Sequence, residues 1–333
     1  MKKILFSILA MAAMAACATD EPIALNQEAI QFGNAFVDNS VRATDPSYSN
    51  YDIQSFNVYG TVNGGNGDVL IYPGTLVEKN SAAYGAAWTC PVQQYWVAGA
   101  EYKFVAIVDG KESGVTDTTI VDGMPTEITY TADGETDLLC QTVTKTASTD
   151  PAVPNGLVSF DFLHLLSKVN FTVVNKSTTA TGYSFVVKAI NFAGSVKGVY
   201  DVVNNTWKAG SYTSGDTSVG NTRTVDSNEV TDIVVPTGTA STELETEVLF
   251  IPGTYNITFT VDILFNGNLV TSTDYPAAGT YAYTLEANKA YNFKVEVAVG
   301  ELIQFTVAKK PTWENGNTND SDEDDVNDYV PLA

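Results

Sequence analysis

The sequence predicts an all-β protein built from two antiparallel β-sandwiches in tandem. Apolar and polar residues alternate along many short segments, which is typical of strands with one buried face. In "NITFTVDILF" (256–265), every second residue from Ile257 to Phe265 is apolar, and "AYNFKVEVAV" (290–299) repeats the pattern. Turn pairs such as Asn266-Gly267 separate these segments, and no convincing amphipathic helical window occurs. Short strands between such turns favour β-sandwiches.

Length and charge limit the classes of function. The chain has 333 residues, enough for about two domains, and 44% of them are hydrophobic. Its formal net charge is −22. Because a chain this acidic repels phosphate backbones, we expect no nucleic-acid partner.

The N-terminus has the pattern of an export signal. Lys2 and Lys3 precede an apolar run, and Met14-Ala15-Ala16-Cys17 resembles a bacterial lipobox. We therefore predict that residues 1–16 are a lipoprotein-type signal peptide and that Cys17 carries the lipid. In the alternative, an ordinary cleaved signal with an unrelated cysteine, the protein is released without an anchor.

The rest of the chain divides by composition. Residues 28–37 ("EAIQFGNAFV") read as a first strand with Ile30 and Phe32 facing inward. The polar stretch 144–156 contains two prolines and predicts a linker. The predicted parts after the signal peptide are a propeptide with the first strand (17–42), an N-terminal sandwich (43–150), a C-terminal sandwich (151–310) and an acidic tail (311–333).

Few residues point to chemistry. The single histidine, His164, lies between apolar residues and excludes a multi-histidine metal site. The acidic run 320–325 lacks the glycine-punctuated spacing of a calcium loop, and we expect no metal, no cofactor and no enzymatic activity. A hydrolase with a carboxylate pair is the least favoured class. Cys90 and Cys140 either form a disulfide or are two separate buried thiols, and the sequence leaves both alternatives open.

Several phrases, taken in order, resemble the fimbrillin-like (Mfa-like) family of Bacteroidetes, the subunits of type V pili. The resemblance covers nearly all of the chain after Cys17, whereas Cys140 and the acidic tail depart from the family pattern. The phrases are "FNVYG" (56–60), "WTCPVQQYWVAGAEYKFVAIV" (88–108), "DLLCQT" (137–142), "FDFLHLLSKVNFTVVN" (160–175), "GVYDVVNNTW" (198–207), "VLFIPGTYNITFTV" (248–261) and "LEANKAYNFKVEV" (285–297).

The resemblance implies two tandem transthyretin-like sandwiches, export as a lipidated precursor to the outer membrane, and processing at the cell surface. In these pilins a trypsin-like protease, arginine-specific in the best-known members, cuts in the loop after the first strand. Here the cut would fall between Arg42 and Ala43, in a polar stretch typical of exposed loops. Arg223 is the only other arginine. The alternative is that Arg42 is a solvated loop residue without a role.

Loss of the first strand would leave unpaired backbone groups beside an apolar groove, which a strand of the next subunit could fill head-to-tail. The favoured donor is 301–309 ("ELIQFTVAK"), or its immediate neighbour, because Ile303, Phe305 and Val307 share one face. The second candidate is 326–333, which contains Pro331 and suits a strand end.

The sequence thus favours a structural fimbrial subunit (shaft, anchor or tip) whose partners are other pilin subunits, a processing protease and, through lipid, the outer membrane. The alternative is a non-polymerising surface lipoprotein that binds glycan or matrix. Such a protein would use Trp88, Tyr95 and Trp96 as a stacking platform, whereas these residues also fit a sandwich core.

Overall fold

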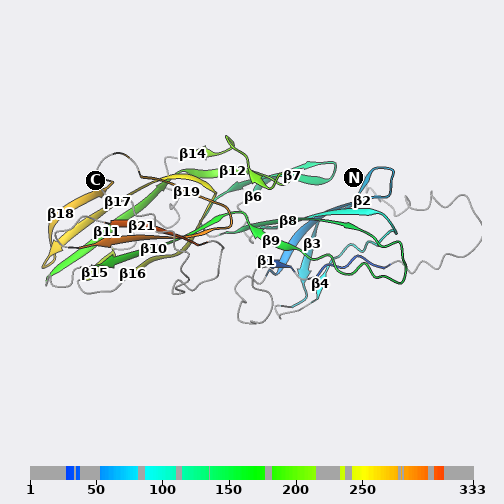
Figure 1. Cartoon of the computed structure of the whole chain (residues 1–333), viewed down its shortest axis with the longest axis horizontal. Helices are drawn as coiled ribbons and strands as arrows, with labels where there is room; N and C mark the ends of the chain where they lie inside the picture. The colour runs from blue at the N-terminus through cyan, green and yellow to red at the C-terminus, as the bar shows by residue number, and fades with distance from the viewer. Residues whose placement is uncertain are drawn as a thin grey trace, which may run out of the picture.

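The computed structural model shows an elongated protein, with the N-terminal strands at one end and the C-terminal strands at the other (Figure 1). All regular elements among the described residues are strands, which confirms the predicted all-β class. The structure describes residues 28–33, 35–37, 53–81, 87–109, 115–134, 136–176, 182–214, 233–236, 242–276, 279, 281–298 and 304–310.

Seven strands form the N-terminal sheet, in the order β1-β9-β8-β5-β2-β3-β4. Neighbours are antiparallel except β1 and β9, which run parallel. The strands are β1 (Phe36–Val37), β2 (Ser55–Asn63), β3 (Asp68–Lys79), β4 (Trp88–Thr89), β5 (Glu101–Asp109), β8 (Leu138–Thr146) and β9 (Asp161–His164).

The N-terminal sheet continues past the boundary predicted at 150/151. Its strand β9 pairs with β8, and Phe160 and Phe162 are buried in the same core as β2 and β5. The apolar alternation resumes after the proline-bearing stretch, so these residues still find their buried face on the N-terminal sheet. After β9 the chain leaves the N-terminal sheet and next enters a C-terminal sheet at β10 (Ser167–Asn175).

A second sheet contains strands from both halves of the chain, and we call it the shared sheet. Its strands β7 and β12 pair antiparallel, with Ile128 opposite Tyr200. The order is β13-β12-β7-β6, with β14 also paired to β12. Its strands are β6 (Val115–Val121), β7 (Met124–Thr131), β12 (Ser195–Asp201), β13 (Thr206–Trp207) and β14 (Thr213–Ser214).

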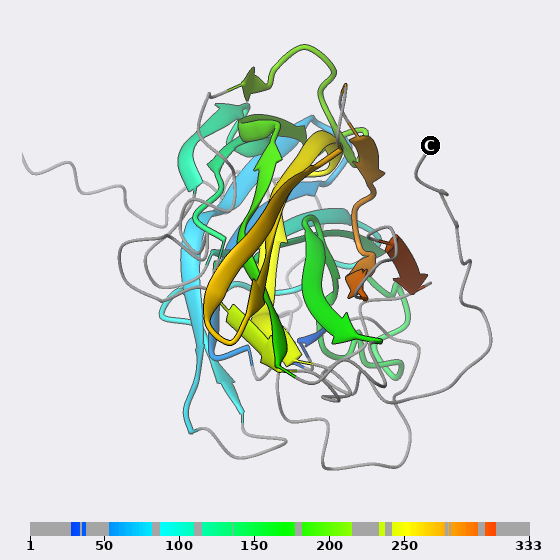
Figure 2. The same ribbon diagram turned by 90° about the vertical axis from the view of Figure 1, so that its left-hand side faces the viewer.

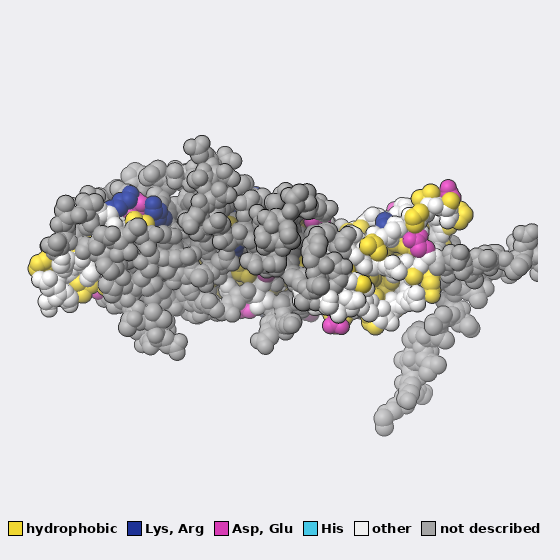
Figure 3. Space-filling view, turned by 90° about the horizontal axis from the view of Figure 1, so that it is seen from below, with side chains coloured by type: hydrophobic (Ala, Val, Ile, Leu, Met, Phe, Trp, Pro, Cys, Tyr) yellow, Lys and Arg dark blue, Asp and Glu magenta, His cyan; other side chains and the backbone are white. Residues whose placement is uncertain are grey.

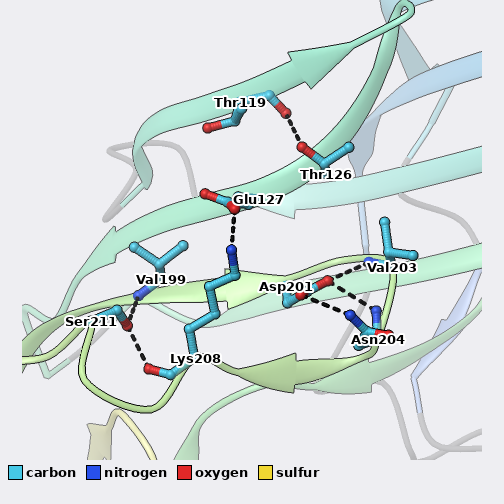
Figure 4. Close-up of polar contacts among 9 residues, drawn as sticks. All are labelled: Thr119, Thr126, Glu127, Val199, Asp201, Val203, Asn204, Lys208 and Ser211. Carbon is cyan, nitrogen blue, oxygen red and sulfur yellow. Dashed lines mark hydrogen bonds and ion pairs between the residues drawn. The ribbon is translucent and has the colours of Figure 1, made fainter.

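One ion pair joins the two halves of the chain in the shared sheet, and local hydrogen bonds close a turn beside it (Figure 4). Lys208, next to β13, forms an ion pair with Glu127 on β7. Asp201 closes the β12–β13 turn by accepting hydrogen bonds from the backbone N–H groups of Val203 and Asn204, both at 3.0 Å. The Asn204 side-chain amide, with these N–H groups, holds the pKa of Asp201 below its ordinary value.

Two further sheets form the C-terminal sandwich. One has the order β16-β10-β20-β21 and the other β15-β11-β17-β18, with β19 also paired to β17. Figure 2 looks at this end and shows β17 and β18 on one side and β10, β20 and β21 on the other. The strands are β10 (Ser167–Asn175), β11 (Tyr183–Ala193), β15 (Ile233–Pro236), β16 (Thr242–Phe250), β17 (Gly253–Phe265), β18 (Asn268–Tyr275), β19 (Tyr281–Leu285), β20 (Ala290–Val297) and β21 (Gln304–Lys310).

The Asn266-Gly267 turn predicted from the sequence joins β17 to β18. Both residues have positive φ, at 48° and 78°, as a tight hairpin turn of this type requires. Along β17, Ile257, Phe259 and Val261 are buried as the alternation predicts, but Phe265 at the turn is exposed.

Within the described ranges, the buried side chains form three clusters. One lies in the C-terminal sandwich, and a second contains Phe56, Tyr102 and Phe104 on one face of the N-terminal sheet. The third joins the other face of that sheet to the shared sheet, where the Trp207 indole N–H donates to the Leu165 carbonyl at 2.8 Å. The two halves of the chain therefore contact each other through the shared sheet and through this third cluster.

Candidate functional site

The chain preceding the predicted cleavage site is built into the N-terminal core. We call the described part of residues 28–37 the N-terminal segment. The Ile30 N–H donates to the Gln94 carbonyl at 2.8 Å, and the Trp96 N–H donates to the Glu28 carbonyl at 2.9 Å. On its other side, the segment makes two backbone hydrogen bonds to Val158, one with its N–H and one with its carbonyl. The N-terminal segment thus lies between residues 94–96 and residues 158–162.

The N-terminal segment is not the single strand that the sequence predicted. Ala29 makes an isolated antiparallel bridge to Tyr95, and Phe32 makes a parallel bridge to Val158. Only β1, at its end, forms a strand, and it pairs with β9. The segment changes partner between Ile30 and Phe32, which breaks the regular ladder.

Phe32 is the centre of the apolar contacts. It is 5% exposed, and its ring packs against those of Phe56, Tyr72 and Phe104, with centroid separations of 6.2, 5.4 and 6.1 Å. A fourth ring, that of Phe160, stacks at 6.2 Å. Ile30 is buried in the same cluster, so both inward-facing residues predicted for this segment are in the core.

Glu28 anchors the start of the N-terminal segment. Its Oε2 accepts hydrogen bonds from the Asn155 backbone N–H at 2.7 Å and from the Asn155 side-chain amide at 2.8 Å. Its Oε1 accepts a bond from the Gly156 N–H at 3.2 Å. We call Asn155, Gly156 and the nearby Lys145 the carboxylate cradle, because all three offer a donor or a positive charge to Glu28.

The carboxylate cradle favours a charged carboxylate. The Asn155 backbone N–H, with the other donors and Lys145, lowers the pKa of Glu28 from its ordinary 4.5. The Lys145 ammonium donates to the carbonyls of Asn155 at 2.5 Å and Leu157 at 3.0 Å, and lies 5.3 Å from the centre of the Trp96 ring. Burial lowers the pKa of Lys145, and the charge of Glu28 opposes that shift.

Without the N-terminal segment, four backbone groups would lose their partners: the Gln94 carbonyl, the Trp96 N–H, and both groups of Val158. The aromatic pocket that Phe32 fills would open to water, and β9 would become a sheet edge. Such an edge beside an apolar pocket can bind an added strand. We call this place the segment groove.

The favoured donor segment overlaps β21. This strand is at the edge of its sheet and pairs antiparallel with β20, with Val295 opposite Phe305. Val307 is 1% exposed and belongs to the core of the C-terminal sandwich. Ile303 lies outside the described residues.

The two cysteines are free thiols, so the disulfide alternative is not what the structure has. The reason is their placement. Cys140 packs in the cluster next to the shared sheet, whereas Cys90 packs against the cluster on the other face of the N-terminal sheet. Burial raises the pKa of both thiols, that of Cys140 to about 12.

The aromatic residues proposed for a stacking platform do not form one. Trp96 is 4% exposed, and Trp88 packs against Phe56 at 5.1 Å between ring centres, while Tyr95 is 39% exposed. On the face seen from below, the described surface is mostly uncharged, with scattered acidic side chains and a few Lys or Arg side chains gathered toward the C-terminal end (Figure 3).

The described residues show no candidate metal site or membrane helix. His164 is buried, and its Nδ1 lies 2.5 Å from Asp137 Oδ2. No group of three or more acidic, cysteine or histidine side chains within the described ranges is placed to hold a metal ion. In that same part of the chain, no helix is long and apolar enough to cross a membrane.

Four residues of the sequence predictions, Cys17, Arg42, Ala43 and Ile303, lie outside the described residues, as does the second donor candidate, 326–333. In contrast, no pattern in the sequence indicates the carboxylate cradle. Glu28 and Asn155 are 127 positions apart, and an Asn-Gly pair in a polar stretch is common in turns.

The fold and the segment groove define a class: an all-β protein whose N-terminal segment completes its own core. The fimbrillin-like family matches residues 42–311, so the chain belongs to this family. A comparison with curated proteins found no match.

Solved structures show a similar fold. A fimbrial protein from Bacteroides vulgatus is 15% identical, with a TM-score of 0.59, over 85% of this chain and 99% of that one. A candidate cell adhesion protein from Bacteroides uniformis is also 15% identical, with a TM-score of 0.50, over 87% of this chain and 98% of that one.

Proposed function

We propose that this protein is a non-enzymatic structural subunit of a fimbria at the cell surface, exported as a lipoprotein through Cys17 and cleaved between Arg42 and Ala43. Membership of the fimbrillin-like family supports a fimbrial role. One observation carries the cleavage step: the N-terminal segment, which precedes Arg42, inserts its Phe32 side chain into the aromatic core of the N-terminal sheet.

Cleavage would cut the covalent link between the N-terminal segment and the rest of the fold. Once the segment leaves, the segment groove would offer unpaired backbone groups and an apolar pocket to another chain. A C-terminal segment of the next subunit, either β21 with the residues before it or residues 326–333, would bind there. The contact is head-to-tail and therefore generates a filament.

The two arginines of the chain provide the test. Arg42→Ala should leave the protein full-length and monomeric, because the N-terminal segment stays linked and keeps the groove filled. Arg223→Ala is the matched control and should be processed and assembled normally. Intact mass and high-molecular-weight ladders on unboiled gels measure both. Normal ladders from Arg42→Ala would contradict the proposal.

A further inference from the structure

The sequence of the N-terminal segment recurs near the C-terminus. Residues 28–32 read EAIQF and residues 301–305 read ELIQF, so only Ala29 and Leu302 differ. Over the longer stretches 28–36 and 301–309, five of nine residues are identical, because Ala35 and Ala308 also match.

Three of the repeated residues are those whose side chains hold the N-terminal segment. Glu28 occupies the carboxylate cradle, and Ile30 and Phe32 are buried in the aromatic core. Their equivalents are Glu301, Ile303 and Phe305. Strand side chains that alternate in position share a face, so a Glu-x-Ile-x-Phe sequence presents all three to one groove.

The differing position tolerates the larger side chain. Ala29 is only half-buried and bridges Tyr95, which is itself well exposed. A leucine at this place can extend over the surface without entering the packed pocket around Phe32.

We propose that residues 301–305 of one copy replace residues 28–32 in the segment groove of the next copy, in the same direction and register. Glu301 would then occupy the carboxylate cradle, Ile303 the place of Ile30, and Phe305 the aromatic pocket. This inference rests on the proposed function, which supplies a vacant groove, and it names the segment that fills it.

The position of β21 makes the exchange feasible. As an edge strand it has one neighbour, β20, so only one ladder must open. In the segment groove, residues 301–305 would lie between residues 94–96 and residues 158–162. They would gain backbone partners on both sides, as the N-terminal segment has. Residues 326–333 (VNDYVPLA) contain no Glu-x-Ile-x-Phe sequence, so the groove chemistry favours 301–305.

A cysteine pair reports the register directly. Ala29 bridges Tyr95 in the precursor, so Leu302 of the incoming copy should face Tyr95 of its neighbour. Directly opposed residues in antiparallel pairing are close enough for a disulfide. In a Cys90→Ala background, Tyr95→Cys with Leu302→Cys should link successive copies into a covalent ladder on non-reducing gels, with loss of the ladder on reduction.

Matched pairs give the controls. Ala29→Cys with Tyr95→Cys should form a bond within one uncleaved chain, which establishes that the geometry suits a disulfide. Tyr95→Cys with Gln304→Cys shifts the register by two residues and should not link. A ladder from the Gln304 pair, or none from the Leu302 pair in filaments that form normally, would overturn the proposal and leave the fimbrial function standing. Absence of filaments from the wild-type protein would contradict the proposed function itself.

A peptide assay separates groove binding from folding of the donor subunit. A synthetic peptide of residues 301–309 should bind protein processed at Arg42, and a peptide of residues 28–36 should compete with it. Replacing the peptide phenylalanine (Phe305→Ala) should weaken binding by about 100-fold or more. Replacing the glutamate (Glu301→Gln) should weaken it several-fold, because the cradle would lose its charged partner. Equal binding by the wild-type 301–309 peptide and its two variants would refute the register.

Discussion

Phe32 gives the sharpest prediction about the N-terminal segment, because its side chain carries most of the apolar contact. Its ring is almost fully buried among four aromatic rings, with centroids 5.4–6.2 Å away. Phe→Ala substitutions in such places typically cost about 3–5 kcal/mol, from lost burial and the cavity left behind. Phe32→Ala should therefore release the segment from the groove far more often.

Amide hydrogen exchange of the uncleaved protein measures this release locally. The N–H groups of Ile30 and Trp96 bond across the segment boundary and exchange when it opens. In Phe32→Ala their protection should fall roughly 150- to 5,000-fold, while amides of β20 keep theirs.

The matched control is Gln31→Ala, since Gln31 is exposed and its side chain should contribute within about 0.5 kcal/mol. A loss of protection below tenfold in Phe32→Ala would refute the reasoning, as would an equal loss in Gln31→Ala. After cleavage the substituted residue is gone, so the processed protein should match wild type in stability.

Three further predictions concern other contacts. Because the folded state lowers the pKa of Glu28, its anchoring should be complete above about pH 4.5 and weaken as the pH falls through the lowered value; protection factors of the segment amides should show this step, and Glu28→Gln should abolish it. Trp207→Phe removes a buried hydrogen bond between the halves and should lower the free energy of unfolding by about 1–3 kcal/mol. Lys208→Met breaks a half-exposed ion pair with Glu127 and should change the free energy of unfolding by less than about 1 kcal/mol. Urea titration measures both changes. Cys17→Ala should lose membrane association on fractionation, because acyl chains provide the anchor, and its persistence with the outer membrane would rule out lipidation there.

The strand pattern made the all-β class predictable. Ile257, Phe259 and Val261 alternate with polar residues and are buried, as are Phe293 and Val295 on β20. Local alternation reports which face of a strand is buried, and this information survives in any arrangement of sheets.

The pairing of distant strands was not predictable in this way. The strand β7 could pair with any strand of suitable length, and nothing in residues 124–131 specifies β12. The same limit applies to the carboxylate cradle. Glu28 contacts Asn155 only because β9 pairs with β1, which places the residues before β9 beside the N-terminal segment. Long-range contacts of this kind depend on the whole chain.

The N-terminal residue of assembled surface fimbriae tests the central claim most directly. Sheared filaments, dissociated and sequenced from the N-terminus, should begin at Ala43, because the segment that fills the groove must be detached before a second copy can bind. Filaments whose subunits begin at Cys17, with the N-terminal segment still attached, would contradict the account.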